Sequence, residues 1–249
     1  MICSNFYNIF LKPQTIVMQK FLSFTLFTVL FVLIIAGCSK NKKEPLVITP
    51  TVNPLPYSVL VYYITPTDKA FNADYYSGIK SCALSLQNWF KGQMGNGKTF
   101  LLNPVVVDTV TSTHNSAWFG ANNGADISGS GSYAYHNTLY EIKQLLGTNF
   151  NITNNLYFVF VTSDFPDETI PKGLAAEGLS RITALAGSNQ NQAIGDAGHA
   201  LGHAFGLPEV DVINPNAIMS TGYPQYPSCI LQQAEKDSLN ASPFFTVHQ

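Results

Sequence analysis

Two histidines lie four residues apart in the stretch GDAGHALGHAFGLPEV at 195–210. They restrict the possible fold and function of this chain more than any other feature of its sequence. On a helix, His199 and His203 lie about 40° apart on one face, so that both rings can bind one metal ion. Gly206 follows three residues after the second histidine, and glycine accepts the left-handed dihedrals that end a helix sharply. The spacing therefore predicts a helix that begins near Asn191 and ends at Gly206, with two metal ligands on one side.

A third ligand is available three residues beyond the glycine. Glu209 carries a carboxylate, which is an acceptable zinc ligand, and Asp211 is a second carboxylate that competes with it for this role. The alternative is that the histidines bind no metal and only pack on a helix surface. The downstream segment NAIMS, which contains Met219, favours the metal site over this alternative.

These two segments resemble the metzincin metalloproteases. HALGHAFGLPE at 199–209 is similar to their zinc signature, HExxHxxGxxH, and NAIMS at 216–220 is similar to their Met-turn, a tight turn beneath the metal. The likeness covers roughly 57–220. It implies a zinc cofactor, a peptide or protein ligand, and an α/β (α+β) single domain. In that domain a twisted mixed sheet packs with helices, and the metal-binding helix lies under a cleft.

The sequence departs from the family pattern at two positions that bear on activity. Ala200 stands where the family has the glutamate that activates the metal-bound water, and general acid–base catalysis contributes about 10²–10⁴-fold to such a reaction. Glu209 stands where the family usually has histidine. The resemblance therefore implies a zinc metallopeptidase-like protein with impaired or absent activity. Two alternatives stay open: an active peptidase with another carboxylate as base, and a non-enzymatic module on the cell surface that binds peptide or protein.

Asp196 is the carboxylate that could replace the missing base. It lies one helical turn before His199 and within about 60° of both histidines, so it could contact a histidine ring, or the water, or instead face solvent or cap the helix. Tyr223 and Tyr226 follow the Met-turn. In some metzincins a tyrosine near that turn approaches the metal, which makes Tyr223 a candidate cleft residue.

The N-terminal region predicts export and a lipid anchor. A basic start and a long apolar run follow Met18, which is a candidate true start, and residues 1–37 are typical of a secretory signal peptide. The end of this run, IIAGC, resembles the lipobox of bacterial lipoproteins, which implies lipidation at Cys38. The alternative is a single spanning helix over 21–37, which is short for that role.

Residues 38–56 contain four prolines and read as a tether between this anchor and a domain at 57–249. The expected location is the cell envelope, on the outer membrane or at the periplasmic or extracellular face. Nucleic acid is excluded as a partner because the chain has a net charge of −2 and no basic cluster apart from KNKK at 40–43.

Hydrophobic patterning predicts the order of elements within the domain. Cys82 and Cys229 fall within it, and they are either a disulfide or two buried thiols. A long loop at 112–132 contains Trp118 and Phe119, which either line a cleft or pack beneath the loop. The expected strands are 57–64, 99–110 (broken by Pro104), 155–163 and 180–185, and the expected helices are 73–93, 136–146, 191–206 and 229–239.

Overall fold

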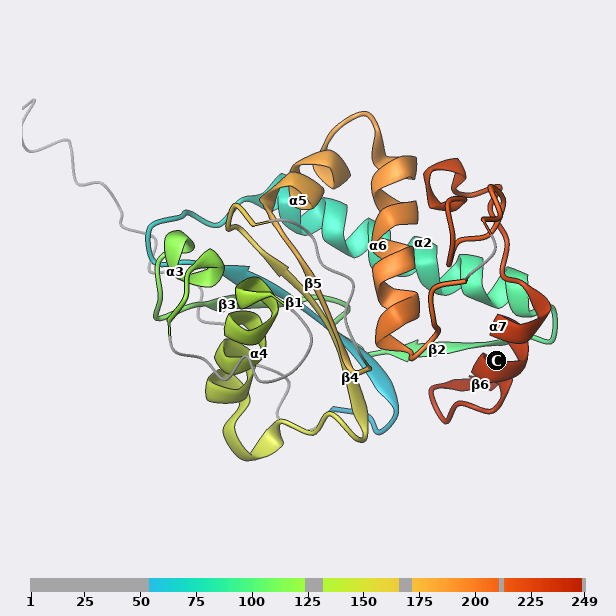
Figure 1. Ribbon diagram of the computed structural model, residues 1–249. Coiled ribbons are helices and arrows are strands. Elements are labelled where there is room, and N and C mark those ends of the chain that lie inside the picture. Colours follow the sequence, from blue (N-terminus) through green and yellow to red (C-terminus); the bar gives the residue numbers. More distant parts are fainter. Residues whose placement is uncertain (1–53, 124–131, 166–171, 211–212, 248–249) are drawn as a thin grey trace, which may run out of the picture. The chain divides into compact units, whose positions relative to one another are not determined.

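The computed structural model describes residues 54–123, 132–165, 172–210 and 213–247 (Figure 1). The predicted signal peptide, Cys38, the tether up to residue 53 and Asp211 lie outside these residues and stay predictions. Among the described residues, no helix is both long enough and apolar enough to cross a membrane.

A mixed sheet forms the centre of the domain, with strands in the order β5-β4-β1-β2-β6 and β3 paired to β1 (Figure 1). All pairs are parallel except the pair of β2 with β6. This arrangement confirms the predicted α/β class. The strands are β1 Ser58–Thr65, β2 Lys98–Leu102, β3 Asp108–Thr111, β4 Asn155–Val161, β5 Leu174–Glu177 and β6 Phe245–Val247.

The two faces of the sheet carry separate apolar cores. Along β1, Val59, Val61 and Tyr63 belong to one core and the intervening Leu60 and Tyr62 to the other, as the two-residue period of a strand requires. Helices α2 (Ala73–Met94), α5 (Leu179–Ala186) and α6 (Gln190–Ala204) contribute to the first core. Helix α4 (Tyr133–Leu146) and the short α3 (Ser116–Gly120) contribute to the second.

The predicted strand at 99–110 is two strands, divided where Pro104 was expected to break it. Leu101 in β2 lies opposite Ser58 near the start of β1, and Asp108 in β3 lies opposite Tyr62 further along. Proline has no N–H to donate to a strand neighbour, which accounts for the interruption.

Three other expectations need correction. The segment at 180–185 is not a strand but lies in α5, with Ile182 and Leu185 buried on one side of it. The strand in this region is instead β5, which was not predicted. The segment at 112–132, expected to be a loop, contains the short helix α3; its Phe119 is fully buried, as expected for packing rather than for lining a cleft. The helix expected at 229–239 is α7, Gln233–Asn240, which begins later.

The two cysteines of the domain are buried free thiols rather than a disulfide. Burial raises the pKa of the Cys229 thiol to about 11 and that of the Cys82 thiol still further. Both are therefore protonated and unreactive near neutral pH.

Candidate metal centre

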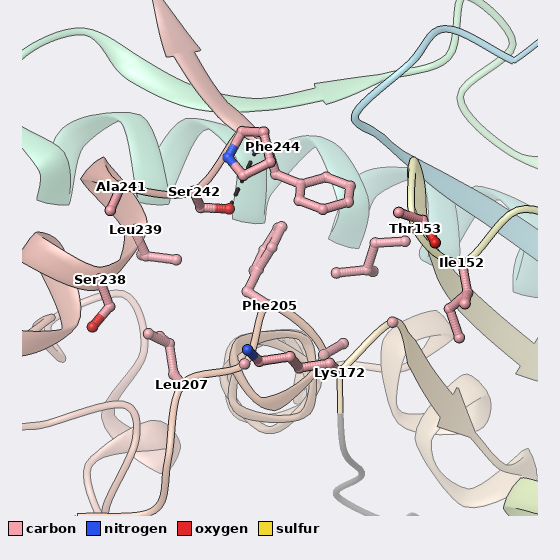
Figure 2. Close-up of a pocket in the computed structure, with 15 residues that line it drawn as sticks. Ile152, Thr153, Lys172, Phe205, Leu207, Ser238, Leu239, Ala241, Ser242 and Phe244 are labelled. Carbon is pink, nitrogen blue, oxygen red and sulfur yellow. Dashed lines mark hydrogen bonds between the residues drawn. The ribbon is translucent and has the colours of Figure 1, made fainter.

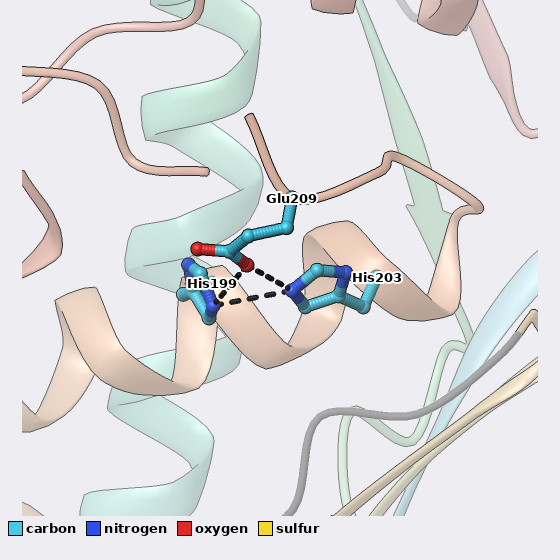
Figure 3. A group of neighbouring side chains, drawn as sticks. All are labelled: His199, His203 and Glu209. Atoms are coloured by element: carbon cyan, nitrogen blue, oxygen red, sulfur yellow. Dashed lines mark hydrogen bonds and ion pairs between the residues drawn. The ribbon is translucent and has the colours of Figure 1, made fainter. Parts of the chain in front are cut away.

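Helix α6 ends in a turn that only glycine accommodates easily. Gly206 has φ +91°, its N–H donates to the His203 carbonyl at 2.7 Å, and the Leu207 N–H donates to the Gly202 carbonyl at 3.0 Å. These two bonds satisfy carbonyls that the helix leaves open at its C-terminus. The chain reverses here, and Glu209 comes back beside the helix (Figure 3).

The three predicted ligands lie together (Figure 3). Nε2 of His199 and Nε2 of His203 are 3.2 Å apart. One oxygen of Glu209, Oε2, lies 3.0 Å from the His203 nitrogen and 3.4 Å from the His199 nitrogen. These atoms form a group with the residue types and the spacing of a metal site.

The other nitrogen of each ring is held by a backbone carbonyl. Nδ1 of His199 lies 2.7 Å from the Ile218 oxygen, and Nδ1 of His203 lies 3.0 Å from the Leu207 oxygen. A carbonyl only accepts hydrogen bonds, so each Nδ1 carries a proton. In the neutral form of each ring, the Nε2 lone pair then faces the other ring. Two lone pairs and a carboxylate this close repel one another unless a cation or proton lies between them. The group therefore fits zinc, which takes two imidazole nitrogens and a carboxylate with one position left open.

Burial lowers the pKa of His199, while its hydrogen bond to the Ile218 carbonyl acts in the opposite direction. Loss of solvent disfavours the charged imidazolium, so the neutral ring is favoured. The neutral ring is the form that binds a metal.

The segment expected to resemble a Met-turn lies directly against α6. Met219 is fully buried, and a Cβ added at Gly202 would come within 2.2 Å of its sulfur, so the absence of a side chain on the helix makes the close approach possible. The same segment supplies the Ile218 carbonyl that holds His199. The Val210 N–H donates to the Met219 carbonyl at 3.2 Å, which ties the chain after Glu209 to this turn.

The fold is shared with OgpA from Akkermansia muciniphila. An OgpA structure of a catalytically inactive form, in complex with an O-glycopeptide substrate (glycodrosocin), superposes with a TM-score of 0.57 at 16% sequence identity. The match covers 83% of this chain and 65% of OgpA, so the chain spans less than two thirds of OgpA. A wild-type OgpA structure gives a TM-score of 0.53 at the same identity and coverage.

A weaker match is archaemetzincin from Methanopyrus kandleri, at 11% identity and a TM-score of 0.39, which covers 74% of this chain and 94% of archaemetzincin. That likeness is too slight to assign a fold. No family model and no curated protein sequence matches the chain. The similarity to OgpA is therefore one of fold, and the roles of individual residues rest on the geometry of this chain.

Asp196 does not reach the histidine rings, whose Nδ1 atoms are taken by backbone carbonyls. Its carboxylate instead pairs with Arg181, which reaches it from α5 and also contacts Glu177 at 3.3 Å. The structure thus places the candidate base in an ion pair beside the site.

Ala200 is buried, with 6% of its surface exposed, and belongs to the apolar core. A methyl group here neither accepts nor donates a proton. Within the described part of the chain, Glu209 is the one carboxylate in the group with His199 and His203.

Tyr223 packs against the site, and Tyr226 does not. The ring centroids of Tyr223 and His199 are 4.9 Å apart, whereas the Tyr226 ring packs on Trp89 with centroids 6.1 Å apart. The turn that carries Tyr223 lies so close to α6 that a Cβ at Gly195 would come within 1.9 Å of the Tyr223 carbonyl oxygen. This contact limits how far Tyr223 can move from the histidines.

Sequence reasoning missed the two carbonyl acceptors, at Ile218 and Leu207. Every residue has a backbone carbonyl, so the sequence carries no signal for which carbonyl will face a ring. For Ile218 alone, the resemblance of residues 216–220 to a turn beneath the metal indicated that backbone atoms would lie near the histidines.

Proposed function

We propose that this protein is an exported, lipid-anchored, metallopeptidase-like protein that binds zinc through His199, His203 and Glu209. In this proposal it binds peptide in a cleft beside the metal and is impaired or inactive in peptide cleavage. The convergence of two Nε2 atoms and one carboxylate oxygen, with both Nδ1 atoms held by carbonyls, carries the zinc assignment. The lipid anchor rests on the resemblance of the segment before Cys38 to a lipobox.

Different residues of the chain have different roles at this site. The carbonyls of Ile218 and Leu207 fix both rings in the tautomer that directs Nε2 to the metal, and Glu209 contributes a negative charge that favours a dication. Zinc, when bound, supplies a Lewis acid that polarises a peptide carbonyl. Such a site binds a peptide and orients it.

Cleavage also requires a group that moves protons, and the site lacks one where the resemblance places it. Ala200 has no such group, and Asp196 is paired with Arg181. Loss of general acid–base catalysis costs about 10²–10⁴-fold in rate. This favours a binding function with weak or no peptidase activity over an enzyme that uses Asp196.

The proposed ligand is a peptide or a protein segment. The OgpA structure that shares this fold holds an O-glycopeptide, which supports a peptide ligand here. The match covers 65% of OgpA, and the rest of OgpA gives no information on the ligand of this chain.

Restoring the missing carboxylate tests this proposal. We expect Ala200→Glu to raise cleavage of a mixed peptide pool by about 10²-fold or more over wild type, with zinc content measured in each protein. Gln192→Glu is the matched control, since it adds the same group to an exposed position of α6 about two turns before His199. Because Ala200 is buried, the thermal stability of its variant is measured as well.

Two outcomes would contradict this reading. Strong cleavage by the wild type, abolished by Asp196→Asn with zinc retained, would make the protein a working peptidase whose base is Asp196. A folded, zinc-loaded Ala200→Glu variant that neither cleaves nor binds peptides would show that the proposed peptide-binding cleft does not exist.

A further inference from the structure

A cavity of about 440 Å³ opens at the C-terminal end of α6 (Figure 2). Its wall comes from the end of this helix and the turn after it, from the start of β4 and the chain before it, from the segment that leads into β5, and from the end of α7 with the chain that follows it. The volume lies within the range of small-molecule pockets. None of His199, His203 and Glu209 lines it, although it adjoins the metal group through Leu207, whose carbonyl accepts the hydrogen bond of His203 Nδ1.

Polar and apolar atoms contribute about equally to its inner surface, and the apolar part comes from aromatic and aliphatic side chains. The rings of Phe205 and Phe244 both line it, with centroids 6.1 Å apart, and the buried side chains of Leu156 and Leu239 contribute further apolar surface. Figure 2 shows Phe205 directed into the space beneath Phe244. An apolar body of modest size could bury one side against these rings.

Lys172 is the one charged residue that lines the cavity, and no lining residue is acidic. Its chain lies across the end of α6, where its Cε would be 2.5 Å from a Cβ added at Gly206, and its nitrogen points towards Leu207 (Figure 2). Among the described residues, no carboxylate forms an ion pair with it. The cavity thus has a net positive charge beside its apolar wall.

The helix end does not require this lysine as a cap. Each of the last four carbonyls of α6 already accepts a backbone N–H. The N–H groups of Phe205, Leu207, Gly206 and Gly173 donate to the carbonyls of Leu201, Gly202, His203 and Ala204, in that order. The ammonium group is therefore available to a ligand rather than committed to open helix carbonyls.

We infer that this cavity binds a small carboxylic acid with an apolar body, such as an aryl or medium-chain aliphatic carboxylate. The carboxylate pairs with Lys172, and the apolar body lies against Phe205 and Phe244. The inference is independent of the proposed peptide-binding function, because it uses none of the metal-binding side chains.

Calorimetric titration of the purified protein with 3-phenylpropanoate tests this inference, with 3-phenylpropanamide as the uncharged analogue. We expect saturable binding of the acid, about tenfold weaker binding of the amide, and a loss of about tenfold in affinity for the acid in Lys172→Met. Lys80→Met is the matched control, since it removes an exposed lysine of α2 that does not line the cavity. Phe244→Ala should weaken the binding of both compounds.

A carboxylate could also bind at the metal group. The variant His203→Ala distinguishes binding there from binding in this cavity. We expect the variant to keep its affinity for 3-phenylpropanoate, and Lys172→Met to keep its zinc content. The inference is overturned if the acid and the amide bind equally, if neither binds, if Lys172→Met and Lys80→Met behave alike, or if His203→Ala abolishes binding.

Discussion

Gly195 allows the turn that carries Tyr223 to lie against helix α6. A Cβ at this position would lie 1.9 Å from the Tyr223 carbonyl oxygen and 2.8 Å from the Tyr226 Cβ. Both distances are far below ordinary contact, and the nearer atom belongs to the backbone. No side-chain rotation relieves that contact, so Gly195→Ala has to displace either the helix or the turn.

The expected magnitude follows from two opposing effects. Replacing glycine by alanine inside a helix stabilises a protein by about 0.5–1 kcal/mol. Overpacking a well-filled site costs about 1–3 kcal/mol, and the upper end applies here because a backbone atom blocks the new methyl group. Gly195→Ala should therefore lower the free energy of unfolding by about 2 kcal/mol. Gly92→Ala in α2, whose new Cβ meets nothing within 4 Å, should raise it by about 0.5–1 kcal/mol.

Urea unfolding followed by circular dichroism measures both variants against wild type. Gly195→Ala should also weaken zinc binding, because the displaced turn carries Tyr223 and lies beside His199. Gly92→Ala should leave zinc binding unchanged. If both variants stabilise the protein to the same extent, the close contact between α6 and this turn does not exist.

Three further variants or reagents test other parts of the account. Arg181→Met should lower the free energy of unfolding by about 3 kcal/mol, because it leaves two largely buried carboxylates without this cation; Lys80→Met is the exposed control. Cys38→Ala should release the protein from the membrane fraction, and an uncleaved, membrane-retained variant would indicate a spanning helix instead. Alkylation of the native protein near neutral pH should leave Cys82 and Cys229 unlabelled in peptide maps, and labelling of both should follow unfolding.

The convergence of the histidines was predictable because it depends on local geometry alone. A separation of four residues on a helix places His199 and His203 on one face in any surroundings. The left-handed turn at Gly206 is also local, so the return of Glu209 to the helix could be expected. Neither inference required knowledge of the sheet.

The ion pair of Asp196 was not predictable, because its partner comes from another element. Helical spacing placed Asp196 on the side of the histidines, but Arg181 reaches it from α5, which had been read as a strand. The cavity at the end of α6 escaped prediction for the same reason. Lys172 and Phe244 lie more than 70 residues apart in the sequence, and only the packed fold brings them to one space.

Strand β5 shows that the intrinsic helix and strand propensities of its residues do not decide its secondary structure. Its sequence, LAAE, is rich in residues that favour helices, and β-branched residues are absent from it. Pairing with β4 and complete burial place it in the sheet nonetheless. The next segment contains isoleucine and threonine and forms a helix, because Ile182 and Leu185 bury one side against the core.

The zinc content of protein purified without chelator tests the central claim most directly. Elemental analysis should find about one zinc per chain in wild type and in His136→Ala, which changes a histidine of α4 outside the metal group, and none in a folded His203→Ala variant. Stoichiometric zinc in His203→Ala, or none in wild type after exposure to zinc, would contradict the account.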